Sequence, residues 1–168
     1  HGCAGIWNDA HVKAYRRITN FIREQGAIPA IQLGHAGRKA ACRPPWENFR
    51  PLTVEDAERG MPPWPPISSS PLPVSEGAQV PLTMDEAEIK RVVRAWSDAA
   101  QRSLDAGFEV VEVHGAHGYL IQQFLSPIVN RRTDGYGGDI EGRMRLALEI
   151  VEAVRAVWPN DRPVFFRV

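Results

Sequence analysis

Helical patterns and short apolar runs alternate along this chain, and this alternation limits its fold more than any other feature. Apolar residues recur at helical spacing in three segments, residues 9–25, 83–107 and 140–157. Each is followed by a short apolar run that predicts a buried strand, at residues 28–33, 108–113 and 163–168. Alternating helices and strands indicate an α/β fold with parallel strands, either a barrel or a doubly wound sheet. Because a barrel needs about eight such units, three strands cannot close one.

Local signals mark where the predicted helices begin and end. Asn8 or Asp9 can cap the first helix, and Gly26 stands at the position where helices commonly end in a left-handed residue. At the second helix, Thr83 and Glu86 have the spacing of a capping box, in which each side chain accepts the backbone N–H of the other residue. We therefore predict that this helix begins just after Thr83.

Residues 34–82 show no convincing periodicity and hold ten of the fourteen prolines. Prolines stiffen such a segment, and an irregular loop of this length inside a compact domain is usually functional or disordered. Thr53 can cap one short helical piece within it. We interpret residues 1–168 as a single domain with this long Pro/Trp-rich loop, residues 34–82, inside it.

Composition limits the classes of partner. Twenty basic and twenty acidic residues cancel, so no charge excess would attract nucleic acid or an anionic membrane surface. No apolar stretch approaches the roughly 20 residues that span a bilayer, and the first residues lack the pattern of a signal peptide. Cys3 and Cys42 have no metal-like spacing, and two free thiols are typical of the reducing cytoplasm. The first residue is not Met and the last predicted strand stops at Val168, so we expect a piece of a longer protein.

Three polar residues stand at or near the ends of the three predicted strands, namely Gln32, His114 and Arg167. In parallel α/β folds, functional residues gather at the C-terminal ends of the strands. Alternation along the second strand places Glu112 on the same face as His114. These residues predict a site at one edge of the sheet, although either Gln32 or Arg167 alone would fit a surface or salt-bridge role equally well.

The segment from His114 to Tyr119 is the richest in chemistry, with two imidazoles and a phenol within six residues. The N–H groups of His114 and His117 can donate to an oxygen on which negative charge develops, and the phenol of Tyr119 can deliver a proton. Two other interpretations stay open. The three side chains could fix a turn by hydrogen bonding, or the two histidines could bind zinc, although no third ligand is evident.

Two glycine-rich segments carry weaker signals. In the segment 34–38, His35 and Arg38 could contact a cofactor edge, but a role in tying down the long loop is favoured. The segment 135–138 precedes the third helix without a GxGxxG or P-loop pattern, so a turn with a helix cap is favoured over a phosphate site. The charged residues around it are expected to form surface and inter-loop ion pairs: Arg131, Arg132, Asp134, Asp139, Glu141, Arg143 and Arg145.

Taken together, these motifs resemble one family. Residues 32–40 resemble the Q-x-x-HAGR-x-A segment of the old yellow enzymes. A longer signature of the same family is similar to residues 114–119, 123–127, 130, 132–134, 136–138 and 143. The similarity covers most of residues 5–168 in the same order. Residues 2–7 and the Pro/Trp-rich loop resemble the xenobiotic reductase branch among the "thermophilic-like" members.

The resemblance implies a partial TIM (β/α)8 barrel, about three central βα units of an eight-stranded barrel that holds FMN at its mouth. Gln32 would then bind the pyrimidine edge of the flavin, and Arg167 would lie near the edge that becomes anionic on reduction. His114 and His117 would bind the carbonyl or nitro oxygen of the substrate, with His114 also contacting the flavin. Tyr119 would protonate the α-carbon of an activated alkene, and NADPH or NADH would be the hydride donor.

The resemblance also implies a homo-oligomer, and it places other flavin contacts and the phosphate site outside residues 1–168. We therefore expect residues 1–168 alone to bind FMN weakly or not at all and to be inactive. Asp139 and Gly142 depart from the family pattern, which usually has Ser and Asn at these positions. We expect the two differences to affect local packing and not the chemistry of the site. Two alternatives to an ene-reductase stay open: a metal-dependent barrel hydrolase with His114 and His117 as ligands, and a truncated, non-catalytic domain.

Overall fold

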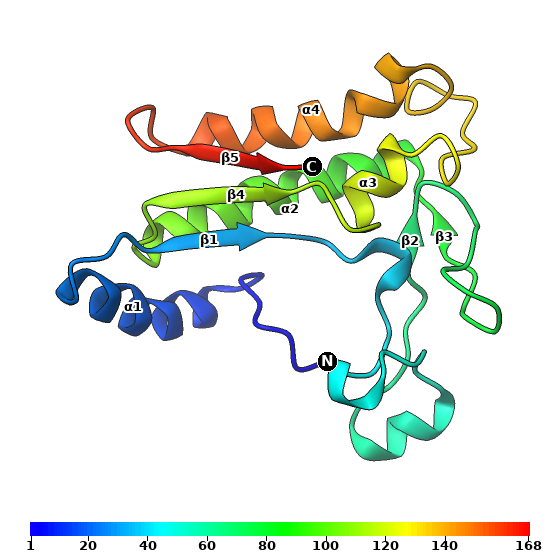
Figure 1. The fold of residues 1–168 in the computed structure, drawn as a ribbon, viewed down its shortest axis with the longest axis horizontal. Coiled ribbons are helices and arrows are strands. Elements are labelled where there is room, and N and C mark those ends of the chain that lie inside the picture. Colours follow the sequence, from blue (N-terminus) through cyan, green and yellow to red (C-terminus); the bar gives the residue numbers. More distant parts are fainter.

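The computed structural model describes all of residues 1–168, and three parallel strands form its central sheet in the order β1-β4-β5 (Figure 1). Each strand follows a long helix in the chain. The three pairs are α1 (Asp9–Glu24) with β1 (Ala30–Leu33), α2 (Glu86–Asp105) with β4 (Val110–His114), and α4 (Ile140–Val157) with β5 (Val164–Arg167). The predicted alternation of helices and parallel strands is therefore confirmed.

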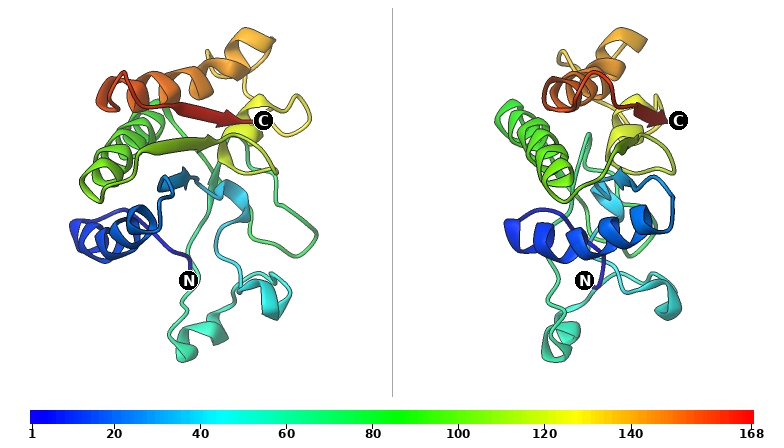
Figure 2. Two further views of the ribbon diagram at one scale, coloured as in Figure 1. Left: turned by 60° about the vertical axis from the view of Figure 1, so that its left-hand side comes forward. Right: turned by 90° about the vertical axis from the view of Figure 1, so that its left-hand side faces the viewer.

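The two faces of the sheet differ in what covers them. Figure 2 shows α2 and α4 on the same side of the strands, where they pack against Val111 and Val113 in a buried cluster of 19 residues. On the other face Gln32, Glu112 and Phe165 lie side by side in register, with Gln32 and Phe165 exposed. Helices on one face of a parallel sheet are what the wall of a barrel requires, because barrel helices form an outer ring.

The ends of the first helix agree with the sequence signals. Asn8 caps α1 by accepting a hydrogen bond from the backbone N–H of His11, and Gly26 follows the helix with a φ of +76°. α2 and α4 each present one apolar stripe to the core, as amphipathic helices on a sheet do. None of the helices combines the length and the apolar character that crossing a bilayer would require.

The second helix begins later than predicted. Thr83 is not its cap, because it belongs to β3 (Leu82–Thr83), which pairs with β2 (Ile67–Ser68). Asp85 takes the cap position and accepts a hydrogen bond from the backbone N–H of Glu88 at 2.7 Å. The capping-box prediction was wrong because the pairing with β2 continues past Thr83: the backbone N–H of Met84 donates to the carbonyl of Ser68 at 3.0 Å, which keeps Met84 out of the helix. Two further differences are that β1 begins at Ala30 instead of residue 28, and that α3 (Leu120–Leu125) was not predicted.

The segment 34–82 has more structure than its sequence predicts. It contains the strand β2 and three short 3₁₀ turns, at Gly37–Lys39, Pro45–Glu47 and Val54–Arg59. The predicted helical piece after Thr53 is confirmed, because Thr53 and Asp56 form a capping box. Asp56 is fully buried, and its carboxylate pairs with Arg43 at 2.7 Å. A buried ion pair therefore closes this loop on itself.

Candidate active site

The sheet ends in a row of polar groups. His114 is the last residue of β4 and stands beside Arg167 of β5 in the parallel register. The backbone N–H of Gly115 donates to the carbonyl of Arg167 at 2.9 Å, so the ladder extends one residue past the strand. Gln32 lies beside Glu112 further back along the strands, and its amide donates a hydrogen bond to that carboxylate. The strand-end residues therefore share one edge and one face of the sheet.

His114 is held as a neutral hydrogen-bond donor. The ring is buried, and its Nδ1 accepts a hydrogen bond from the backbone N–H of Ala116 at 3.3 Å. A neutral imidazole that accepts at Nδ1 carries its proton on Nε2, which is left to donate. Burial holds the pKa of His114 below its usual value, and the neighbouring side chains of His117 and Arg167 lower it further. Near pH 7 this ring therefore donates through Nε2 alone.

His117 and Tyr119 meet the His114 ring edge to face. The His114 ring centroid lies 5.0 Å from that of His117 and 5.1 Å from that of Tyr119, at interplanar angles of 88° and 89°. All three rings line one cavity of about 700 Å³, and most of the remaining lining comes from the loop at residues 34–82. A cavity of this size accommodates a small organic molecule. The structure thus brings the two imidazoles and the phenol together around one space.

The turn that presents these rings is held largely by side chains. His117 and Gly118 have φ angles of +57° and +69°, a left-handed region that residues other than glycine adopt only occasionally. One backbone hydrogen bond spans the turn, from the N–H of Tyr119 to the carbonyl of Ala116 at 3.2 Å. The carbonyl of Gly118 accepts from the Gln123 amide at 2.7 Å. The conformation of His117 therefore depends on residues outside the turn.

Gln123 contacts this site, and the sequence suggested no role for it. Its side chain is buried, and four hydrogen bonds engage its amide. The oxygen accepts from the backbone N–H of Arg38 at 3.1 Å and the Ser68 hydroxyl at 2.9 Å. The nitrogen donates to the carbonyls of Ala36 at 3.2 Å and Gly118 at 2.7 Å. A Cβ at Gly37 would lie 2.2 Å from its oxygen, which requires glycine there. The only sequence signal for Gln123 is its place in the family signature.

Arg38 ties down the long loop, as favoured from the sequence, whereas the His35 side chain bonds only within its own turn. The Arg38 guanidinium donates to the carbonyls of Leu72 and Pro73, each at 3.3 Å. Nδ1 of His35 accepts from the backbone N–H of Gly37 at 3.0 Å. Both side chains also line the cavity.

Two neutral histidines make stability depend on pH. Burial lowers the pKa of both His35 and His114 in the folded state, whereas a histidine in an unfolded chain titrates near about 6.5. Below that pH the unfolded chain binds more protons, so acid favours unfolding. We expect the free energy of unfolding, measured in urea, to fall between about pH 7 and about pH 5.5 by up to roughly 1.4 kcal/mol per pH unit for each histidine. The variant His35→Gln should show a shallower dependence, and a flat wild-type profile would contradict neutral burial.

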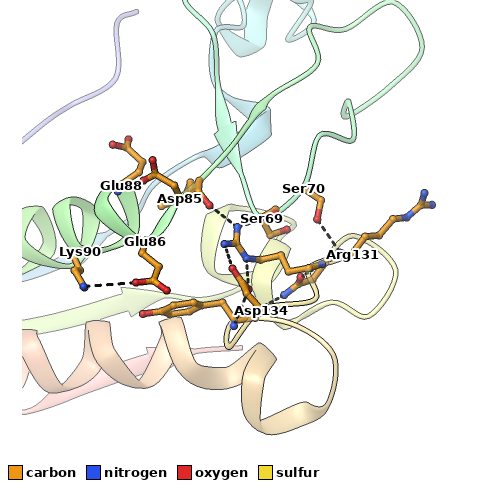
Figure 3. A network of polar contacts seen from close by, with 12 residues as sticks. Ser69, Ser70, Asp85, Glu86, Glu88, Lys90, Arg131 and Asp134 are labelled. Carbon is orange, nitrogen blue, oxygen red and sulfur yellow. Dashed lines mark hydrogen bonds and ion pairs between the residues drawn. The ribbon is translucent and has the colours of Figure 1, made fainter.

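A polar network joins the segment after α3 to the start of α2 (Figure 3). Arg132 donates to the carbonyl of Met84 at 2.6 Å and pairs with Asp134 at 2.5 Å. The hydroxyl of Ser70 accepts from the backbone N–H of Arg131 at 2.8 Å. The pair Arg132 with Asp134 confirms one of the predicted ion pairs, and the network holds the long loop to the segment after α3.

The glycine-rich segment 135–138 is a turn before a capped helix, as favoured from the sequence. Asp139 caps α4, and its carboxylate accepts from the backbone N–H of Gly142 at 2.8 Å. A Cβ at Gly142 would lie 2.2 Å from the carbonyl oxygen of Gly137, so the turn packs directly on this glycine. The two departures from the family pattern therefore lie together in one tightly packed helix start, and neither residue lines the cavity.

Gln32, His114 and Arg167 are the residues of this chain whose chemistry fits a flavin. They supply an amide, an imidazole N–H and a guanidinium on one face of adjacent strands. This donor set suits a planar ring that has polar atoms along one edge and gains negative charge on reduction. Gln32 and Arg167 do not line the cavity that His117 and Tyr119 share. His114 lines this cavity and also stands beside Arg167 at the strand ends. No three His, Cys, Asp or Glu side chains are grouped as a metal ion would require.

Comparison with known proteins shows which protein family this chain resembles in sequence and in fold. All of residues 1–168 match the model of the NADH:flavin oxidoreductase / NADH oxidase family. An NADPH dehydrogenase of Geobacillus sp. (strain WCH70) is 42% identical over 164 residues, which make up 98% of this chain and 42% of that protein. An NADH:flavin oxidoreductase of Gibberella zeae is 38% identical over 167 residues, 98% of this chain and 40% of that protein. The structure of morphinone reductase in complex with tetrahydroNAD has a TM-score of 0.79 and 34% identity, over 97% of this chain and 45% of that one.

The chain thus spans 42% of the length of the Geobacillus relative. Similarity to morphinone reductase over nearly the whole chain identifies β1, β4 and β5 as three parallel strands of a partial α/β barrel. The family match indicates FMN, with NAD(P)H, as the cofactor set. The chain belongs to the NADH:flavin oxidoreductase / NADH oxidase family, the old yellow enzymes.

Proposed function

We propose that the protein is an FMN-dependent ene-reductase, which uses NADPH or NADH to reduce C=C bonds activated by a carbonyl or nitro group. The observation that carries this proposal is the meeting of His114, His117 and Tyr119 around one cavity at the end of β4. Such a site can bind a substrate oxygen through two N–H donors and can offer a proton from the phenol.

His114 and His117 bind and polarise the substrate oxygen. Nδ1 of His114 is occupied by the backbone N–H of Ala116, so the N–H of Nε2 is the group that donates to the substrate. The two donors draw electron density toward the oxygen, which makes the β-carbon of the alkene electrophilic. They also stabilise the negative charge that develops on the oxygen, and one preorganised donor of this kind contributes roughly 2.7–4 kcal/mol.

Tyr119 delivers the proton that completes the saturated product. Its ring is half-buried against His114, which orients the hydroxyl for transfer to the α-carbon. Gln32 and Arg167 would hold the polar edge of FMN, and His114 would contact the flavin as well as the substrate. When bound, FMN supplies the hydride chemistry that links NAD(P)H to the β-carbon.

The remaining assignments concern the whole protein. Residues 1–168 form part of a single FMN-binding barrel domain, in which the loop at residues 34–82 builds the substrate cavity. Cys3 and Cys42 are free thiols, which suits a reducing compartment such as the cytoplasm. Other flavin contacts and the phosphate site come from segments outside residues 1–168, and the complete protein pairs with further copies of itself.

Turnover of an enone by the FMN-loaded protein tests this function. We expect stoichiometric flavin absorbance and NADPH oxidation that 2-cyclohexenone accelerates, with cyclohexanone as the product. NADPH oxidation at the same rate with and without cyclohexenone would contradict an ene-reductase. A protein that carries a stoichiometric metal ion and no flavin would instead favour the hydrolase alternative.

A further inference from the structure

Lys39 contacts two of the three residues to which the proposed reaction assigns a role, His117 and Tyr119. Its ammonium donates to the carbonyl oxygen of His117 at 2.7 Å and lies 5.6 Å from the ring centroid of Tyr119. Lys39 itself lines the cavity, and no acidic side chain does. It follows β1 in the chain, whereas both of its contacts lie in the turn after β4. One cation therefore joins two strand-end turns.

The turn at residues 116–119 needs such a partner. At its tip the carbonyl of His117 and both polar backbone groups of Gly118 bond to side chains. The N–H of Gly118 donates to Gln122, and its carbonyl accepts from Gln123. Of these three side-chain partners, Lys39 alone bonds to His117, the non-glycine residue with a positive φ. Because few residues other than glycine adopt this conformation, the Lys39 bond to the His117 carbonyl helps to hold it in place.

The same ammonium constrains the phenol. The Tyr119 ring has His114 against it at an angle of 89° and the Lys39 ammonium 5.6 Å from its centroid, a distance at which a cation attracts an aromatic face. We propose that Lys39 is a positioning residue of this site, which holds the His117 donor and the Tyr119 proton donor in their working orientations. It acts through these two residues and does not itself react. The kinetic meaning of this inference rests on the proposed ene-reductase function.

Hydrogen exchange tests the structural part of the proposal without any activity. The variant Lys39→Met removes the ammonium and keeps much of the aliphatic chain, whereas Lys39→Arg retains a cation that can donate to the same carbonyl. In the FMN-loaded protein, we expect the Tyr119 amide to exchange roughly tenfold faster in Lys39→Met, because a hydrogen bond to a charged group is lost. Lys39→Arg should restore most of the protection. The control Lys90→Met changes an exposed lysine of α2 and should leave this amide unchanged.

Ligand binding tests whether Lys39 acts through His117. Phenol bound in the cavity reports on the imidazole donors, and its dissociation constant should rise roughly tenfold in Lys39→Met. In a His117→Ala background the same change should have almost no further effect, because coupled residues are not additive. Unchanged exchange at Tyr119, or a Lys39→Met effect that adds fully to that of His117→Ala, would overturn the proposal. If the wild-type protein failed to reduce cyclohexenone, the proposed ene-reductase function would be contradicted. The exchange measurement would still decide whether Lys39 positions the turn.

Discussion

Replacing Tyr119 with Phe is expected to slow the reduction of cyclohexenone by roughly 10²–10⁴-fold, the usual contribution of a general acid. The change removes one hydroxyl and keeps the ring, so the contacts with His114 and Lys39 remain. Because only the proton donor is lost, NADPH should bleach the bound flavin at the wild-type rate. Stopped-flow absorbance measures these two half-reactions separately.

The variant Tyr15→Phe is the matched control. Tyr15 lies in α1 and packs on Phe108 with ring centroids 5.5 Å apart, outside the cavity. Its loss of a hydroxyl should leave both half-reactions unchanged. Equal losses in flavin reduction and alkene reduction for Tyr119→Phe would show that the phenol acts in something other than proton delivery.

The variants His114→Ala and His117→Ala are each expected to lower the rate of alkene reduction by roughly 10²–10³-fold, the effect of removing one oxyanion donor. Both should also weaken the binding of phenol, because each imidazole N–H is a proposed donor to the ligand oxygen. His114 additionally faces Arg167 across the strand ends, so His114→Ala should alter the flavin spectrum more than His117→Ala does.

These effects require a control for folding, because His114 is buried. Thermal melting of each variant separates lost structure from lost binding. The control His11→Ala changes a histidine of α1 that packs on Trp7 and does not line the cavity. Wild-type affinity for phenol in both His114→Ala and His117→Ala would contradict their role as substrate donors.

Local sequence patterns were sufficient to predict those parts of the structure that depend on residues close together in the chain. α4 runs from residue 140 to residue 157 as predicted, because an acidic cap and an apolar stripe act within the helix itself. The rule that function gathers at the ends of parallel strands placed Gln32, His114 and Arg167 on one edge. The spacing of His114, His117 and Tyr119 within one turn brought their rings to one cavity.

Contacts between distant segments could not be predicted in this way. Thr83 has the residue type and spacing of a helix cap, but pairing of β3 with β2 decides its conformation. Gln123 gains its role only when segments 36–38 and 118, together with Ser68, converge on one buried amide. Lys39 meets His117 across a separation of 78 residues. No periodicity records such convergence, because it arises from the packing of the folded chain.

The most direct test of the active-site assignment is a crystal structure of the full-length, FMN-loaded protein with phenol bound. The phenolic oxygen is expected within roughly 2.7–3.2 Å of nitrogen atoms of both His114 and His117, and the flavin is expected in contact with Gln32 and Arg167. A phenol bound elsewhere, or imidazole rings that turn away from the flavin, would contradict the assignment.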